Sequence, residues 1–234
     1  IATFSLVKPS TASSCISARS ERFTGHPDSM QVPYRTNGHV KLAICSAIKP
    51  AAVPHTVLAH PPHWLTAAQL HPAPAALQRD WLFDQDSLTR RLTTLSNHRF
   101  SVIPLQEGWQ SMRQDETSAL GVPAKAKGWV REVFLRGNDQ TWVFARSVAA
   151  RSALEGSGLA LDQLGSRSLG ELLFSDRAFL RGELQVSRYP AAWLPDSVRH
   201  EQLWARRSCF RRGELAVLVA EVFLPELWQA AGEL

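Results

Sequence analysis

One carboxylate interrupts the apolar run Ala216 to Leu224, AVLVAEVFL. Alternation along a strand places Glu221 on the same face as four apolar side chains, Leu215, Val217, Val219 and Phe223. A carboxylate on a buried face must be paired, hydrogen-bonded or protonated, because an unpaired charge in an apolar interior is too costly to persist. Glu221 is therefore the first candidate for chemistry.

Three arginines also lie on strand faces that large apolar groups otherwise occupy. Arg131 follows Trp129 and precedes Val133, and Arg146 and Arg206 have similar surroundings. A guanidinium in such a place either extends to the edge of the sheet or pairs with a carboxylate. Each arginine alone fits the first reading, but three of them with Glu221 on the closing strand favour a pocket for an anionic ligand.

Other kinds of catalytic or binding site find little support. His60, His63 and His71 have a spacing that could suit a metal, but the intervening prolines deny them a regular helix. No glycine-rich phosphate loop and no Gly-x-Ser-x-Gly elbow is present, and Cys209 has no fixed histidine neighbour. We therefore expect no metal and no nucleotide cofactor.

The positive charge of the chain is concentrated near its start. The net charge is +5, yet residues 61–234 hold twenty Lys and Arg against nineteen acids, while residues 1–60 hold six against two. The near-neutral body disfavours a nucleic-acid-binding protein. No run approaches the ~18 apolar residues of a membrane-spanning helix, and three dispersed cysteines fit a reducing compartment. We predict a cytoplasmic protein without stable membrane insertion.

Two regions differ in pattern. Residues 1–58 are rich in Ser, Thr, Pro and His and lack a sustained period, which predicts a disordered or non-native extension, either a translated upstream region or a transit-like peptide. Residues 59–234 form the predicted domain. Short helices precede a helix capped by Asp86 or Ser87, and residues 152–175 read as helix and turn. Six strands are expected near 99–109, 128–136, 141–149, 179–189, 204–212 and 215–224.

The turns between these strands indicate how the sheet is connected. Residues 136–139 (RGND) and 212–213 (RG) are typical of hairpins. The sum is an α+β domain in which helices cover one side of an antiparallel sheet.

Six strings in order resemble the bacterial chorismate lyase family: DWLFDQDSLTRRL (80–92), GWVREVFL (128–135), WVFARSV (142–148), LGSRSLGELLF (164–174), LWARRSCF (203–210) and AEVFLPE (220–226). The resemblance covers about residues 77–228. It implies a single α+β domain with a six-stranded antiparallel sheet. It also implies a monomer that acts without a metal or an organic cofactor. It also implies conversion of chorismate to 4-hydroxybenzoate and pyruvate, the first committed step of ubiquinone biosynthesis.

The resemblance also implies roles for individual residues. Arg131 would bind the ring carboxylate in a bidentate pair, and Glu221 would lie near the ether oxygen, where it could relay a proton. Leu88, which is usually Met in the family, and Leu169 would contact the ligand through their main chain. Arg146 and Arg206 are candidates for the enolpyruvyl carboxylate or for support of the site.

One alternative is a binding module, because the fold recurs in the effector-binding domains of GntR-type transcription regulators. Such regulators carry a winged helix-turn-helix ahead of the ligand domain, and residues 1–60 show no helical period that would supply one. An orphan ligand-binding protein without turnover is a further alternative.

Overall fold

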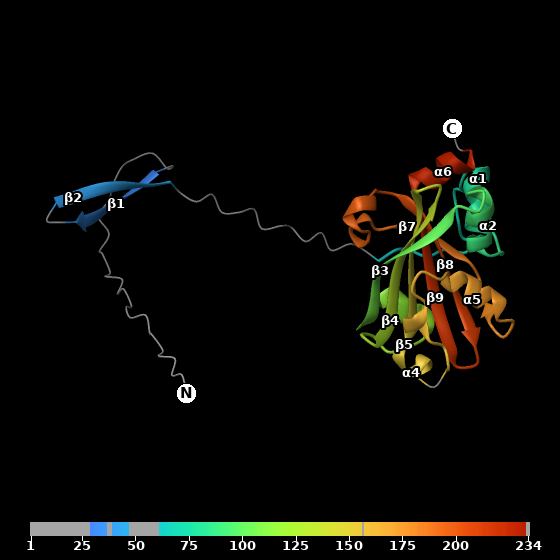
Figure 1. Ribbon diagram of the computed structural model, residues 1–234. Coiled ribbons are helices and arrows are strands. Elements are labelled where there is room, and N and C mark those ends of the chain that lie inside the picture. The colour runs from blue at the N-terminus through green and yellow to red at the C-terminus, as the bar shows by residue number, and fades with distance from the viewer. Residues whose placement is uncertain (1–28, 37–38, 47–60, 156, 233–234) are drawn as a thin grey trace, which may run out of the picture. The chain divides into compact units, whose positions relative to one another are not determined.

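The computed structural model describes residues 29–36, 39–46, 61–155 and 157–232. The chain divides into two units, Ile1–Thr56 and Val57–Leu234. Each unit is described by itself (Figure 1).

The first unit contains two strands, β1 (Ser29–Thr36) and β2 (His39–Ser46), which pair antiparallel with Ser29 opposite Ser46. The expectation that this stretch lacks regular structure does not hold for these strands. Asn37-Gly38 separates them in the sequence, and Asn-Gly between two such runs is a strong hairpin signal that does not depend on a sustained period. The other residues of the predicted extension, 1–58, lie outside the described residues.

The second unit is built on a seven-stranded antiparallel sheet. Its order is β3-β4-β5-β9-β8-β6, and β7 also pairs with β8. The strands are β3 (Phe100–Ser111), β4 (Lys127–Gly137), β5 (Gln140–Ala150), β6 (Leu180–Arg181), β7 (Gln185–Tyr189), β8 (Leu203–Arg212) and β9 (Leu215–Phe223). The predicted α+β class is confirmed.

The seventh strand arises because the predicted strand 179–189 is two strands. Both pair with β8, β6 through Arg181 opposite Phe210 and β7 through Gln185 opposite Arg207. Between them, the Gly182 amide donates to the Cys209 carbonyl at 2.8 Å. A Cβ at position 182 would lie 3.2 Å from that carbonyl oxygen, so glycine permits the close approach at the break.

Helices cover both faces of this sheet. They are α1 (Ala76–Leu82), α2 (Leu88–Leu95), α3 (Gln114–Leu120), α4 (Arg151–Leu154), α5 (Leu169–Ser175) and α6 (Pro225–Ala231), with short 3-10 turns at Leu161–Gln163, Ala191–Trp193 and Asp196–Val198. Leu88 and Leu169 of α2 and α5 line a cavity with Val133 and Ala145 of the sheet. Leu120 of α3 joins a core cluster with Val130, Val148 and Leu218. By the alternation along each strand, these three residues lie on the face of the sheet opposite the cavity. The expectation of helices on one side is therefore incomplete.

Local sequence signals explain the ends of these elements. Ser87 caps α2 by accepting a hydrogen bond from the Arg90 amide, as expected for that position. The turn between β4 and β5 places Asn138 and Asp139 at positive φ, 52° and 62°, which these residue types tolerate. Gly213 has φ 56° between β8 and β9. Both predicted hairpins are confirmed.

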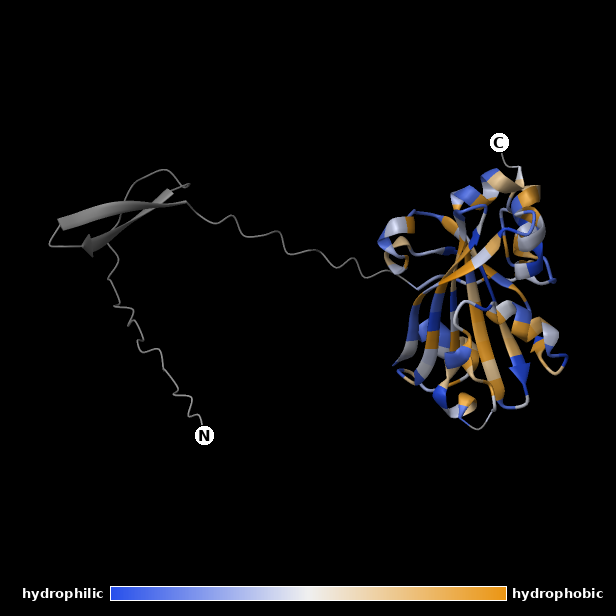
Figure 2. Cartoon of the chain, viewed as in Figure 1, coloured by the Kyte–Doolittle hydropathy of each residue, from blue (hydrophilic) through white to orange (hydrophobic). Residues whose placement is uncertain are grey.

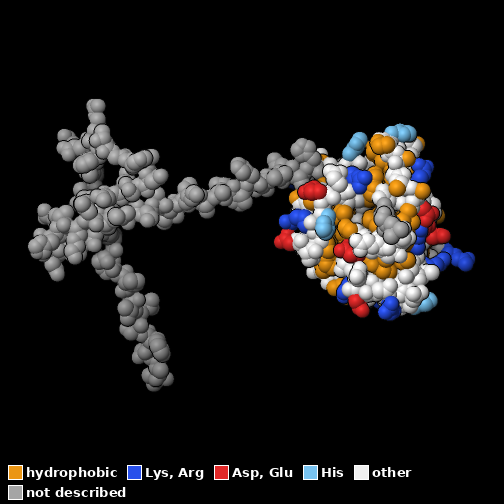
Figure 3. All heavy atoms as spheres, turned by 90° about the horizontal axis from the view of Figure 1, so that it is seen from above, with side chains coloured by type: hydrophobic (Ala, Val, Ile, Leu, Met, Phe, Trp, Pro, Cys, Tyr) orange, Lys and Arg blue, Asp and Glu red, His pale blue; other side chains and the backbone are white. Residues whose placement is uncertain are grey.

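The apolar residues follow the sheet. Figure 2 shows hydrophobic residues, in orange, concentrated along its central strands. In the space-filling view of Figure 3, Lys and Arg alternate with Asp and Glu around the visible face, so neither charge dominates there. Within the described residues, no helix is long and apolar enough to cross a membrane.

Candidate active site

A small cavity lies between the sheet and the first residues of α2 and α5. Strands β4, β5, β8 and β9 supply most of its floor, and about 40 Å³ is free inside. Its charged lining consists of three arginines and one carboxylate, and the remaining lining is mainly apolar. Five of the six predicted site residues line it: Leu88, Arg131, Leu169, Arg206 and Glu221.

Arg131 is held from β4 by neighbours on both sides. Its Cα partners are Glu107 on β3 and Ser147 on β5. The side chain is 2% exposed and forms an ion pair with Glu107, and its Nη2 donates to the carbonyls of Gly165 at 2.7 Å and Arg167 at 3.0 Å. Burial lowers the pKa of Arg131, while the charge of Glu107 acts in the opposite direction. By count, two of its five N–H groups stay available for a ligand.

Glu221 pairs with Arg206. The two residues are Cα partners in the β8 and β9 ladder, and Arg206 Nε donates to Glu221 Oε2 at 2.6 Å. Arg206 is 1% exposed, and its Nη1 also donates to the carbonyls of Trp81 and Asp84. The prediction that this acid must be paired is confirmed, and Arg206 supports Glu221 within the cavity wall.

Leu88 and Leu169 occupy equivalent places. Each is the first residue of its helix, and a serine caps each helix, Ser87 for α2 and Ser168 for α5. The first N–H groups of a helix have no partner within it, so a ligand can accept hydrogen bonds there. Both residues line the cavity, where the predicted main-chain contacts would be made.

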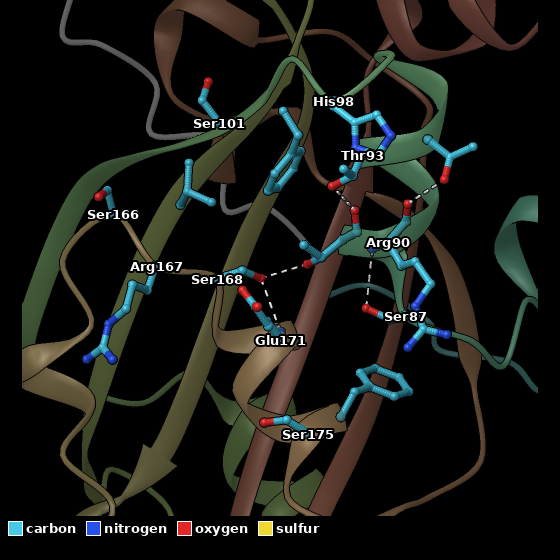
Figure 4. A pocket seen from close by; sticks show the side chains of 15 residues that line it. Ser87, Arg90, Thr93, His98, Ser101, Ser166, Arg167, Ser168, Glu171 and Ser175 are labelled. Atoms are coloured by element: carbon cyan, nitrogen blue, oxygen red, sulfur yellow. Dashed lines mark hydrogen bonds between the residues drawn. The ribbon is translucent and has the colours of Figure 1, made fainter.

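A side-chain hydrogen bond joins these two helices above the cavity. Thr89 Oγ1 and Ser168 Oγ lie 2.6 Å apart (Figure 4). Both residues also line an outer groove of about 600 Å³, which Arg90, His98 and Glu171 border. Thr89, Ser168, Val102 and Phe174 line both spaces, so these four residues form the wall that the cavity and the groove share. The Thr89–Ser168 hydrogen bond is part of that wall.

The structure does not bring Arg146 to this cavity. Its guanidinium lies on the opposite face, where it pairs with Glu116 at 2.6 Å and Glu132 at 2.7 Å. Burial alone would lower the pKa of Arg146, but these hydrogen bonds and charges outweigh burial and raise it. Arg146 is therefore not a ligand for the enolpyruvyl carboxylate, because the sheet lies between its guanidinium and the other candidates.

A one-residue bulge explains why Arg146 is turned away. The hairpin begins with Gly137 opposite Gln140, which would place Arg131 opposite Arg146, but the register shifts between Leu135 and Arg136. Arg131 is consequently opposite Ser147, and Arg146 alternates to the other face.

Two residues of the site were missed in the sequence. Glu107, the partner of Arg131, lies on a strand that α3 separates from β4, so no hairpin register revealed it. Arg181 lines the cavity from β6, directly before the chain leaves the ladder. The local signal for Arg181 was weak, because a two-residue strand shows no alternation.

A metal centre has no candidate in the part of the chain that the structure describes, since no group of three or more His, Cys, Asp or Glu residues is gathered there. His60 lies outside the described residues, and His63 and His71 belong to no such group.

The chorismate lyase family matches residues 58–233. A probable chorismate pyruvate-lyase of Pseudomonas savastanoi pv. phaseolicola is 64% identical over 166 residues, which cover 71% of this chain and 89% of that protein. A protein of the same description from Pseudomonas aeruginosa PAO1 is 65% identical over 170 residues, or 72% of this chain and 94% of that protein.

Solved structures give more distant matches. A possible transcriptional regulator, YydK of Bacillus subtilis, matches with a TM-score of 0.42 at 12% identity, over 57% of this chain and 60% of that chain. The ligand-binding domain of a putative GntR-family regulator from Bordetella bronchiseptica matches with a TM-score of 0.40 at 13% identity, over 55% and 84%. The sequence matches, which span nearly the whole second unit, decide the family: the chain belongs to the chorismate lyase family.

Proposed function

We propose that this protein is a chorismate pyruvate-lyase, which converts chorismate to 4-hydroxybenzoate and pyruvate. One observation carries the proposal beyond family membership: Arg131 and Glu221 line one small cavity whose uncharged lining is mainly apolar. A cyclic dianion needs cationic groups for its carboxylates and an apolar wall for its ring. The product would supply the ring of ubiquinone.

Arg131 binds the ring carboxylate in this proposal. Its guanidinium is fixed by Glu107 and by two carbonyls, so it is already oriented before the ligand arrives. The main-chain N–H groups of Leu88 and Leu169 supply further donors at the same wall. Because this carboxylate is present in both substrate and product, these contacts hold the ring throughout the reaction.

Glu221 lies next to the breaking bond. Its Oε2 accepts from Arg206, and Oε1 makes no hydrogen bond to any described residue. We assign Oε1 to accept a hydrogen bond from the ring hydroxyl, which stays on the ring and becomes the phenol. The ion pair with Arg206 fixes the direction of that acceptor.

The reaction balances without an added reagent. The bond between the ring carbon and the ether oxygen breaks, and its electron pair leaves with the oxygen. The neighbouring hydroxyl-bearing carbon loses a proton, and its C–H electrons complete the aromatic ring. The departing enolate takes up one proton at its methylene carbon, which balances the proton lost from the ring, and becomes pyruvate. Aromatisation drives these steps, so holding chorismate in a reactive pose supplies much of the catalysis.

The test is direct. Purified protein is incubated with chorismate, 4-hydroxybenzoate is followed by absorbance, and pyruvate is measured with a coupled dehydrogenase. Equal amounts of the two products are expected. A folded protein that binds 4-hydroxybenzoate but forms neither product would instead be a binding module.

A further inference from the structure

The second carboxylate of chorismate still needs a partner in the cavity. Arg146 lies on the other face of the sheet, and Arg206 is compensated by Glu221. Arg131 is committed to the ring carboxylate in the proposed function and is paired with Glu107. The arginine that remains is Arg181.

Contacts on three sides hold Arg181 in place. Its Nε donates to Ser208 Oγ at 2.9 Å, and its Nη1 donates to the Gln85 carbonyl at 2.9 Å in the loop between α1 and α2. Its guanidinium carbon lies 5.5 Å from the ring centroid of Phe174 and 5.4 Å from that of Phe210. The side chain is thus ordered before a ligand binds, which lowers the entropic cost of binding.

The charge of Arg181 is left uncompensated at short range. Among the described residues, no carboxylate lies within ion-pairing distance of it, whereas Arg131 and Arg206 each have one. Its Nη2 makes no hydrogen bond to a described residue, which leaves two N–H groups for an acceptor. Burial, together with the nearby charge of Arg206, lowers the pKa of Arg181 to about 10, while the charges of Glu221 and Asp84 act in the opposite direction, so the group is still a cation at neutral pH.

The position of Arg181 suits a ligand with two separated carboxylates. Arg131 projects from β4 and Arg181 from β6, and β5, β9 and β8 lie between these strands. Both arginines nevertheless line one cavity, whose apolar lining includes Leu135, Leu173 and Val219. An apolar surface flanked by two cations matches a ring that carries one carboxylate directly and another on a side arm.

We propose that Arg181 binds the enolpyruvyl carboxylate of chorismate and so distinguishes the substrate from 4-hydroxybenzoate. This inference rests on the proposed function. Because the enolpyruvyl group leaves as pyruvate, the contact exists for the substrate and is absent for the ring product. Arg181 is then a substrate-binding residue, and Ser208 and the Gln85 carbonyl position it.

The two ligands separate this role from a general effect on the cavity. kcat/KM for chorismate and Kd for 4-hydroxybenzoate are measured for the wild-type protein, Arg181→Gln, Arg181→Lys and the control Arg211→Gln. Arg211 is exposed on β8 and does not line the cavity. Loss of a charge-assisted hydrogen bond predicts that Arg181→Gln lowers kcat/KM about 10- to 100-fold, with Kd for 4-hydroxybenzoate unchanged. Arg211→Gln is expected to match the wild type in both.

Each outcome has a distinct meaning. Wild-type protein that makes no product overturns the proposed function itself. Active wild-type protein with an unchanged kcat/KM in Arg181→Gln, or with equal losses for both ligands, overturns the role of Arg181. Should Arg181→Gln fail to fold, Arg181→Lys decides, because it keeps the charge and loses the planar fork. A smaller loss for chorismate alone supports the proposal, and wild-type behaviour contradicts it.

Discussion

Arg206 and Glu221 face each other directly across β8 and β9, and their side chains form an ion pair of 2.6 Å in the cavity wall. The pair neutralises two charges that would otherwise be costly to bury. It also leaves Glu221 with one oxygen toward a ligand. The pair therefore links the stability of the wall to the orientation of the acid.

We expect Glu221→Gln to lower kcat by about 100-fold, the scale of a lost charged acceptor that orients the ring hydroxyl, while Arg206 loses its charged partner. The fall in melting temperature reports the second effect, and 4-hydroxybenzoate formation reports the first. Glu214→Gln, an exposed change in the hairpin that joins the same two strands, is the matched control. Wild-type kcat in Glu221→Gln would remove Glu221 from the mechanism.

Arg131→Ala should weaken both ligands, because chorismate and 4-hydroxybenzoate share the ring carboxylate. Loss of a charge-assisted contact in a buried site predicts a rise of about 100-fold in Kd for 4-hydroxybenzoate, measured by calorimetry. Arg131→Lys is expected to recover little, because an ammonium lacks the planar fork. Lys127→Ala, an exposed change on the same strand, controls for effects on β4. Unchanged product binding in Arg131→Ala would exclude the assignment.

Arg146→Met tests the opposite face. The change leaves Glu116 and Glu132 without their shared cation, and breaking a buried pair costs about 3–5 kcal/mol of unfolding free energy. Denaturant unfolding measures that loss. KM for chorismate, measured well below the melting temperature, is expected to stay at the wild-type value. A raised KM with unchanged stability would return Arg146 to the site.

The register of two hairpins shows what the sequence could and could not predict. Counting back from the two-residue turn at Gly213 and Glu214 gives Arg206 opposite Glu221, so this ion pair was accessible from the sequence. The same count in the other hairpin would put Arg146 opposite Arg131. This prediction is wrong because the bulge shifts the register by one residue. A bulge depends on packing as well as on turn type.

That packing is visible around Gly137. A Cβ at Gly137 would lie 2.1 Å from the ring of Trp142, so the indole occupies the space that a side chain would need. Trp142 is also the residue of β5 that the register skips. The sequence therefore predicted the strands and the candidate residues, whereas the facing of Arg146 depended on a three-dimensional contact between a glycine and a tryptophan.

Removal of residues 1–55 should leave activity intact. The family match begins at residue 58, and all residues that line the cavity lie beyond it. We expect unchanged kcat/KM for chorismate and an unchanged melting transition of the second unit. A clear loss of turnover or of folding would show that the first unit contributes to the enzyme.

The contact between Thr89 and Ser168 should control how fast ligands exchange. The free volume of about 40 Å³ is near that of one or two water molecules, so the cavity must widen to admit chorismate, and we expect it to do so by separation of α2 and α5. Thr89→Val removes the 2.6 Å hydrogen bond and keeps the shape of the side chain, while Ser168 still caps α5. A single neutral hydrogen bond predicts a rise of about 2- to 10-fold in the dissociation rate of 4-hydroxybenzoate.

Stopped-flow measurement of that dissociation rate checks the prediction. Thr94→Val, which removes an exposed hydroxyl from the same helix and the same groove, is the control and should leave the rate unchanged. If product release limits turnover, kcat rises with the dissociation rate in Thr89→Val; if chemistry limits it, kcat stays constant. Equal dissociation rates in Thr89→Val and the wild type would mean that breaking this hydrogen bond is not part of the step that limits product release.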